Sequence, residues 1–101
     1  MRTSQARVET EMASRYLGQL CKHFAHRLPV QHDDAQGRIE FSIGICTLQA
    51  EPRVLILHAQ SATDDALAQL EGVVTRHLER FAFRDKPEIA WQRQPEASKD
   101  E

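Results

Sequence analysis

The sequence predicts an α+β fold, a two-layer sandwich in which two helices pack on one face of a mostly antiparallel sheet of about five strands. Two segments repeat apolar residues at the three- and four-residue spacing of a helix, and the shorter segments around them alternate apolar and polar residues as strands do. A helix with one apolar face must bury it, and the simplest arrangement lays both helices on the same face of the sheet. The expected element order is β-α-β-β-β-α-β.

Length and composition indicate a single folded domain. The chain has 101 residues, of which 41% are hydrophobic and 28% charged, values typical of a soluble globular domain. A chain of this size forms one core, which we expect residues 1–93 to share. Residues 94–101, QPEASKDE, contain almost nothing to bury, and we predict that they form a disordered tail.

The N-terminal third predicts a strand followed by a helix. Ala6 and Val8 alternate with polar residues in 4–9, which favours a short first strand. Residues 12–27 predict a helix that ends before Pro29, because the residue preceding a proline is pushed out of the α region. The apolar stripe of this helix consists of Ala13, Leu17, Leu20, Phe24 and Leu28.

The middle of the chain predicts three strands with short links. Residues 31–37, QHDDAQG, are polar and predict a turn. Residues 38–43 and 46–50 alternate apolar and polar side chains on either side of Gly44. Residues 53–60 follow with apolar side chains on both faces, which indicates a central strand. Strands linked this closely form an antiparallel meander.

Residues 61–82 carry the clearest helix signal. Ser61 or Thr63 can cap the N-terminus, and two aspartates follow in the first turn, where the helix dipole favours negative charge. A last strand is expected at 87–93, PEIAWQR. The apolar stripe of the helix consists of Ala66, Leu67, Leu70, Val73, Val74, Leu78 and Phe81.

Charge, hydropathy and cysteine usage argue against several classes of protein. The formal net charge of −2 is unlike that of a nucleic-acid binder, which is usually basic. No apolar run approaches the roughly 18 residues of a membrane span, and the N-terminus lacks the apolar core of a secretory signal. Two cysteines without a CxxC motif indicate reduced thiols. We therefore expect a cytoplasmic protein. We also expect it to be a monomer or a weak homodimer.

A cysteine and two histidines within LCKHFAHRL raise the question of a metal site. On a helix Cys21 and His23 point about 160° apart, so they cannot bind one ion together. His23 and His26, three residues apart, are neighbours on the helix surface and would need a further ligand to hold a divalent metal or iron. The candidates for that ligand, just beyond the helix, are His32, Asp33 and Asp34.

The same helix presents a basic surface. Between residues 12 and 28 there is no carboxylate. This surface predicts binding of an anionic ligand or of an acidic protein surface, although cations also stabilise a helix C-terminus without any ligand. The candidate ligand-binding residues are Arg15, Lys22, His23, His26 and Arg27.

Other distinctive side chains are predicted to be structural. His77 falls within the apolar stripe of the second helix, so we expect it to face the sheet, to be substantially buried and to have a hydrogen-bond partner. Cys21 and Cys46 are expected to act as small buried apolar residues. Trp91 shares a strand face with Ile89 and is expected to be buried. No catalytic residues are predicted.

Three segments resemble a known bacterial family. The strings ASRYLGQLCKHFAHRLPV, GRIEFSIGICTLQAE and LEGVVTRHLERFAFRDKPEIAW are similar to the family called domain of unknown function 2218, over about residues 5–92. The positions that match the family pattern are Tyr16, Cys21, Lys22, His23, His26, His77, Arg80, Phe81 and Phe83.

The resemblance implies little about activity, because the family has no catalytic residues to carry over. Some relatives carry a similar domain joined to siderophore-interacting flavin reductases, which implies a link to iron acquisition. We therefore expect a non-enzymatic binding or accessory module with no cofactor, whose ligand is a ferric siderophore or another small anion. One alternative is a metal-binding protein that uses His23 and His26. Another is a partner-docking domain with an exposed sheet face.

Overall fold

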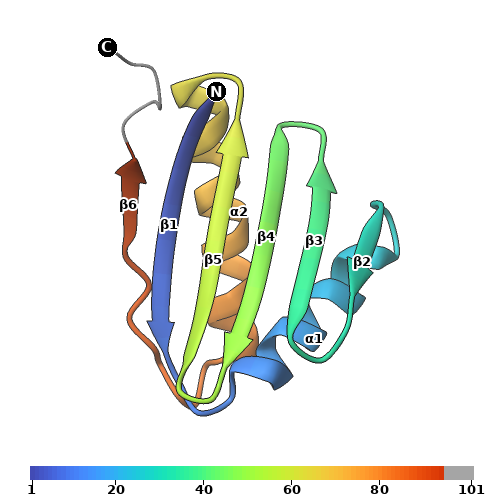
Figure 1. Cartoon of the computed structure of the whole chain (residues 1–101), viewed down its shortest axis with the longest axis vertical. Coiled ribbons are helices and arrows are strands. Elements are labelled where there is room, and N and C mark those ends of the chain that lie inside the picture. Colours follow the sequence, from blue (N-terminus) through green and yellow to red (C-terminus); the bar gives the residue numbers. More distant parts are fainter. Residues whose placement is uncertain (95–101) are drawn as a thin grey trace.

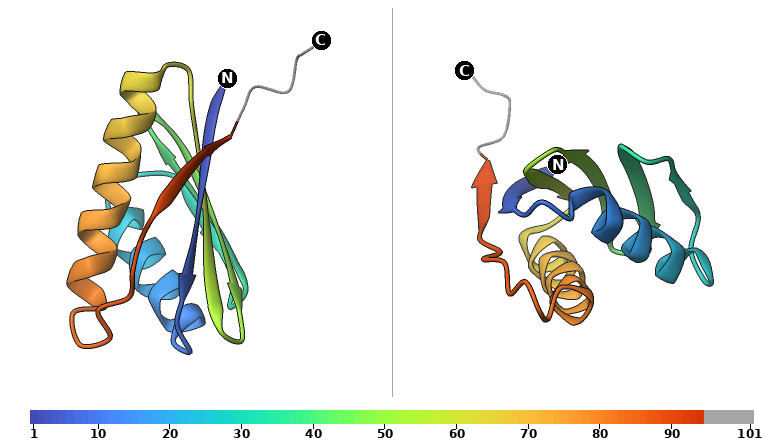
Figure 2. Two further views of the ribbon diagram at one scale, coloured as in Figure 1. Left: turned by 90° about the vertical axis from the view of Figure 1, so that its left-hand side faces the viewer. Right: turned by 90° about the horizontal axis from the view of Figure 1, so that it is seen from below.

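In the computed structural model, which describes residues 1–94, two helices cover one face of an antiparallel sheet of six strands (Figures 1 and 2). The predicted α+β class and layering are confirmed, but the sheet has one strand more than expected. The strand order is β2-β3-β4-β5-β1-β6. The elements are β1 (Arg2–Glu9), α1 (Ala13–Ala25), β2 (Val30–His32), β3 (Gln36–Phe41), β4 (Gly44–Glu51), β5 (Val54–Ser61), α2 (Asp64–Phe81) and β6 (Trp91–Gln94).

The additional strand, β2, lies within the segment that the sequence predicts to be a turn. Val30–His32 pairs with 37–39 of β3, and only the residues between the two strands form the turn. The Oδ1 atom of Asp33 accepts hydrogen bonds of 2.8 Å from the N–H groups of Ala35 and Gln36, which lower the pKa of this carboxyl group. The strand was missed because it is a short edge strand with exposed polar side chains.

Helices α1 and α2 bury most of the stripes expected from their periodicity, whereas Leu28, Ala66, Val73 and Phe81 are half-buried. Leu17, Leu20 and Leu78 have no exposed surface. Helix α2 begins after Thr63, whose Oγ1 accepts a hydrogen bond of 3.1 Å from the N–H of Ala66. The alternative cap, Ser61, is instead the last residue of β5. Neither described helix has the length and apolar content to cross a membrane.

The central position of β5 and the inward face of β1 agree with the alternation in the sequence. Strand β5 pairs with β4 on one side and β1 on the other. Ala6 and Val8 of β1 lie opposite Leu57 and Leu55, and all four are buried under the helices. The meander β3-β4-β5 is therefore extended by the N-terminal strand.

The last strand differs from its predicted bounds. It begins only at Trp91 and ends at Gln94, so the segment before it is not a strand and one residue of the predicted tail belongs to the sheet. The rest of that predicted disordered tail, 95–101, lies outside the described residues.

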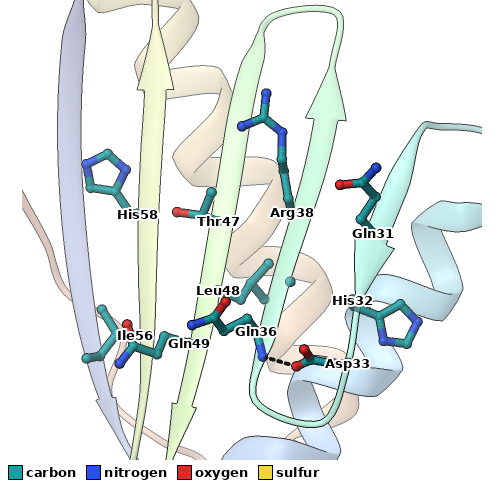
Figure 3. A pocket seen from close by; sticks show the side chains of 11 residues that line it. Gln31, His32, Asp33, Gln36, Arg38, Thr47, Leu48, Gln49, Ile56 and His58 are labelled. Atoms are coloured by element: carbon teal, nitrogen blue, oxygen red, sulfur yellow. Dashed lines mark hydrogen bonds between the residues drawn. The ribbon is translucent and has the colours of Figure 1, made fainter.

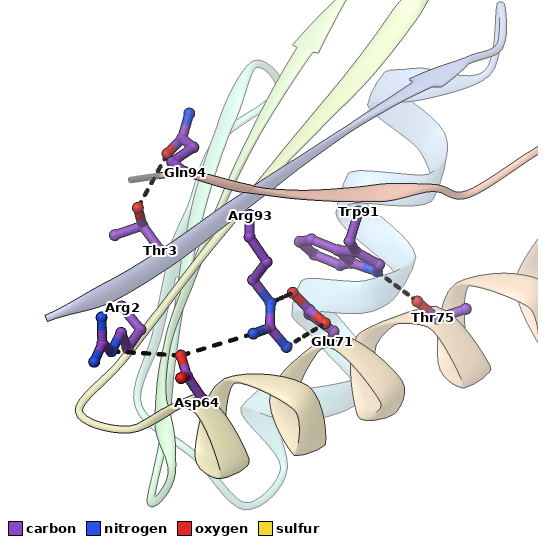
Figure 4. A network of polar contacts seen from close by, with 8 residues as sticks. All are labelled: Arg2, Thr3, Asp64, Glu71, Thr75, Trp91, Arg93 and Gln94. Carbon is purple, nitrogen blue, oxygen red and sulfur yellow. Dashed lines mark hydrogen bonds and ion pairs between the residues drawn. The ribbon is translucent and has the colours of Figure 1, made fainter. Parts of the chain in front are cut away.

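Polar contacts with α2 hold β6 in place (Figure 4). Arg93 donates to Glu71 at 2.9 Å and lies 3.8 Å from Asp64. The indole N–H of Trp91 donates to the Oγ1 of Thr75 at 2.8 Å. Trp91 is half-buried between sheet edge and helix, so the expectation that it is buried is wrong. An edge strand has a neighbour on one side only, which leaves part of the ring exposed.

Candidate functional site

The five candidate residues of the basic surface are all exposed. They do not form one cluster, because Arg15 and His23 are directed toward α2. Arg15 lines a hollow together with residues from the end of α2. The His23 ring lies 5.8 Å from the ring of Phe81 on α2. Arg15 and His23 therefore lie on the side of α1 that faces α2, apart from Lys22, His26 and Arg27.

An aromatic cluster joins the two helices. The ring centroids of His23 and His77 are 5.0 Å apart, and Phe24 lies 4.8 Å from His77 and 5.0 Å from Phe41. His77 is half-buried and its ring packs against rings of α1, whereas the sequence predicts a substantially buried residue that faces the sheet. Its Nδ1 donates a hydrogen bond of 2.7 Å to the carbonyl oxygen of Val73, which supplies the expected partner. The ring turns toward α1 because imidazole packs well against the neighbouring rings.

The structure provides no complete metal site around His23 and His26. Within residues 1–94, no group of three or more His, Cys, Asp or Glu side chains is placed to hold an ion. Asp33 is instead engaged in the β2–β3 turn. The metal-binding alternative remains a prediction without a third ligand in the described part of the chain.

Both cysteines are buried away from solvent. Burial raises the pKa of the Cys21 thiol to about 11 and that of the Cys46 thiol to about 12, with a smaller contribution to Cys46 from Cys21. A thiol with so high a pKa is protonated at neutral pH and is a poor nucleophile or metal ligand. The two residues therefore contribute apolar volume to the core.

Acidification is expected to destabilise the fold through His23. Burial lowers the pKa of this imidazole, and the charges of His77, Arg80, His26 and Arg27 lower it further. The unfolded chain therefore binds the proton at His23 more tightly than the folded protein does. As the pH falls below about 6.5, the ordinary pKa of histidine, protonation favours the unfolded chain and the protein loses stability. Urea midpoints measured at about pH 7.5 and about pH 5 should differ less in His23→Gln than in the unmodified protein.

The matched control for this prediction is His32→Gln, which replaces an exposed histidine of edge strand β2. This variant should lose as much stability on acidification as the unmodified protein. An unchanged pH dependence in His23→Gln would contradict the role assigned to His23.

A hollow of about 710 Å³ opens between α1 and the C-terminal end of α2. We call it the interhelical hollow. Its lining includes Arg15, Tyr16 and Gln19 from α1, and Arg80, Arg84 and Asp85 from α2 and the loop after it.

The three arginines of the interhelical hollow are not neutralised by neighbouring acids. Within the part of the chain that the structure describes, Arg15, Arg80 and Arg84 have no ion pair. Arg93, by contrast, pairs with Glu71 at 2.9 Å. Cationic side chains in a hollow create a positive potential that attracts anions.

Asp85 is the one carboxylate in the lining of the interhelical hollow, and it has other partners. Its Oδ2 accepts hydrogen bonds from the Thr10 hydroxyl at 2.6 Å and from the Tyr16 hydroxyl at 3.2 Å. Burial and Asp85 both raise the pKa of Tyr16, so this hydroxyl remains a donor. These bonds connect the loop after α2 to the beginning of α1, and two of the residues involved, Tyr16 and Asp85, line the hollow.

Arg80 and Arg84 line the interhelical hollow but are not among the ligand-binding residues that the sequence predicts. The sequence analysis placed Arg80 among the positions that match the family pattern and gave it no part in ligand binding. Arg76 and Arg80, four residues apart, are a signal in the sequence that places positive charge on one side of α2, and Arg84 continues this spacing just beyond the end of the helix at Phe81. Periodicity within one helix cannot show that Arg15 of another helix lies beside that row.

A second hollow of about 510 Å³ lies on the open face of the sheet (Figure 3). His58, Thr47 and Arg38 stand opposite one another on neighbouring strands, and Arg38 lies 3.6 Å from Glu40. Most of the surrounding side chains are polar, and the two isoleucines on this face, Ile45 and Ile56, are half-buried. The lining of this second hollow contains one arginine, Arg38, which is paired. The three arginines without ion pairs within residues 1–94 therefore make the interhelical hollow the stronger candidate site. The remaining lining includes Gln31, Gln36 and Gln49.

Comparisons with known proteins identify the family but no activity. The NMR structure of PA4090 from Pseudomonas aeruginosa is similar over 91% of this chain and 96% of that one, with 39% sequence identity and a TM-score of 0.78. No curated protein matches the sequence. The model of the family described as "Uncharacterized protein conserved in bacteria (DUF2218)" matches residues 5–92. The chain therefore belongs to this family of bacterial proteins, DUF2218.

Proposed function

We propose that the protein is a binding module that takes an anionic ligand at the interhelical hollow, and that it is not an enzyme. The observation that carries the proposal is the presence of three arginines, without ion pairs among residues 1–94, in a hollow that has one carboxylate in its lining. Guanidinium groups bind carboxylates and phosphates through paired hydrogen bonds, which favours an anion over a neutral ligand.

A ferric complex of an anionic chelator is one ligand with the required charge. The sequence resembles relatives in which a similar domain is joined to siderophore-interacting reductases, and this resemblance supports a link to iron or siderophore handling. The hollow, of about 710 Å³, is within the range of about 300–1,000 Å³ in which proteins bind small molecules. We therefore propose ferric chelates as the first ligands to test.

Titration with anionic probes should change the amide NMR signals of the interhelical hollow. Citrate and the trianionic gallium(III) tris-catecholate, which replaces paramagnetic iron, are suitable probes. Signals of residues 12–19 and 80–85 should shift, and binding should weaken as salt rises from about 0.05 M to about 0.5 M because ions screen the arginines. Arg80→Gln should weaken binding by about tenfold.

The matched control is Arg53→Gln, which removes an exposed arginine at the β4–β5 turn, outside the lining of this hollow. It should leave the affinity unchanged. If no signal in either segment moves at millimolar citrate or gallium complex, the proposed function is wrong. Equal weakening by both substitutions would show attraction by overall charge and would also contradict it.

A further inference from the structure

The interhelical hollow combines its positive charge with exposed apolar side chains. Met12, Phe81 and Phe83 belong to its lining. Within residues 1–94, the exposed large apolar side chains are Met1, Met12 and Phe83, so two of these three border the same hollow. Phe83 is 62% exposed, an unusual environment for a phenylalanine. Exposed apolar side chains that gather at one concave place indicate a surface that binds something apolar.

Charge and apolar surface are adjacent within this hollow. The guanidinium carbon of Arg84 lies 5.6 Å from the centre of the Phe83 ring, a cation–π contact. The contact keeps a positive group beside the exposed ring, while Arg15 and Arg80 complete the cationic part of the lining. A ligand that fits both parts carries an anionic group next to an apolar body.

We propose that the ligand of the interhelical hollow is an amphipathic anion, whose anionic group pairs with the arginines and whose apolar body packs on Met12 and Phe83. This inference rests on the proposed function and narrows its ligand class. A fully hydrated inorganic anion would leave the apolar side chains exposed, whereas a neutral apolar ligand would leave the arginines unpaired. The hollow, about 710 Å³, has room for both parts of an amphipathic molecule.

Three probes separate the contributions of charge and apolar surface: 4-phenylbutyrate, acetate and 4-phenyl-1-butanol. Acetate shares the carboxylate with the first probe, and the alcohol shares its phenyl chain. Amide NMR titrations of the full chain should show that 4-phenylbutyrate binds at least about tenfold more tightly than either of the others, because burying its apolar body adds to the ion pair. Shifts should be confined to residues 12–19 and 80–85.

A pair of variants tests the assignment to Phe83. Phe83→Ser should reduce the affinity for 4-phenylbutyrate to within about threefold of that for acetate and leave acetate binding unchanged. The control Ile56→Ser removes a half-buried apolar side chain from the open sheet face and should change neither affinity.

The outcomes distinguish this inference from the proposed function. Equal affinities for acetate and 4-phenylbutyrate at the hollow would overturn the amphipathic ligand while leaving an anion site. Equal affinities for 4-phenylbutyrate and the alcohol would overturn both, because the arginines would then have no role in binding. Loss of binding in Ile56→Ser but not in Phe83→Ser would also overturn the inference, since it would place the ligand on the open sheet face.

Discussion

Replacing Leu70 with alanine is expected to lower the free energy of unfolding by about 3 kcal/mol. Leu70 lies on α2 with no exposed surface and belongs to the core between the helices and the sheet. Removing its isobutyl group loses apolar burial and leaves a cavity that the surrounding side chains fill only in part. A domain of this size has a total stability of about 5–15 kcal/mol, so the loss is a large fraction.

Urea unfolding followed by circular dichroism measures this effect as a lower midpoint at an unchanged slope. The matched control is Gln69→Ala, at the preceding, exposed position of the same helix, which should change the stability by less than about 0.5 kcal/mol. Similar effects of the two substitutions would contradict the assignment of Leu70 to the core.

Gly44→Ala is the second substitution with a large expected effect, a loss of about 2–3 kcal/mol. Gly44 begins β4 with a φ of +157°, a conformation that residues with a side chain rarely adopt. A Cβ atom there would collide with the carbonyl oxygen of Gln60 and the Oγ of Ser61. Neither atom can move easily, because β4 and β5 are paired at this point and the Ser61 hydroxyl donates to the carbonyl oxygen of Ile43 at 2.7 Å.

Gly18→Ala is the control for this prediction. Gly18 lies within α1, and a Cβ atom there would have no neighbour within 4 Å. Alanine should therefore stabilise the protein by about 0.5–1 kcal/mol, because it restricts the unfolded chain and favours the helix. The two Gly→Ala variants should shift the urea midpoint in opposite directions. A stabilising effect of Gly44→Ala would contradict the close approach of Gly44 to Gln60 and Ser61 of β5.

The helices and the central strands could be predicted because their apolar periodicity reports directly which side chains are buried. The two leucines Leu17 and Leu20 of α1 and the alternation around Leu55 and Leu57 of β5 agree with the observed core. The edge strands were predicted poorly. Strand β2 has no buried side chain, and β6 has one half-buried residue, Trp91, so neither has a pattern that differs from that of a loop.

The candidate site could be predicted only in part. The sequence identified Arg15 and His23 on α1 as members of a basic surface, and it identified the position of His77 within its helix. It placed His77 against the sheet, because the angular position of a residue on one helix does not say where the neighbouring helix packs. The rings of His23 and His77, 5.0 Å apart, belong to different helices, and their contact depends on the packing of α1 and α2.

By itself, the sequence determined the class of fold, the two helices, the strands of the meander and the membership in the family, because these follow from local periodicity and from matching residues. Only the tertiary structure decided that Arg15 shares a hollow with Arg80 and Arg84, and that Met12 and Phe83 border it. These residues lie on two segments about seventy positions apart in the chain. Their proximity comes from burying both helices side by side on one sheet face, where the apolar stripes face inward and the arginines remain at the surface.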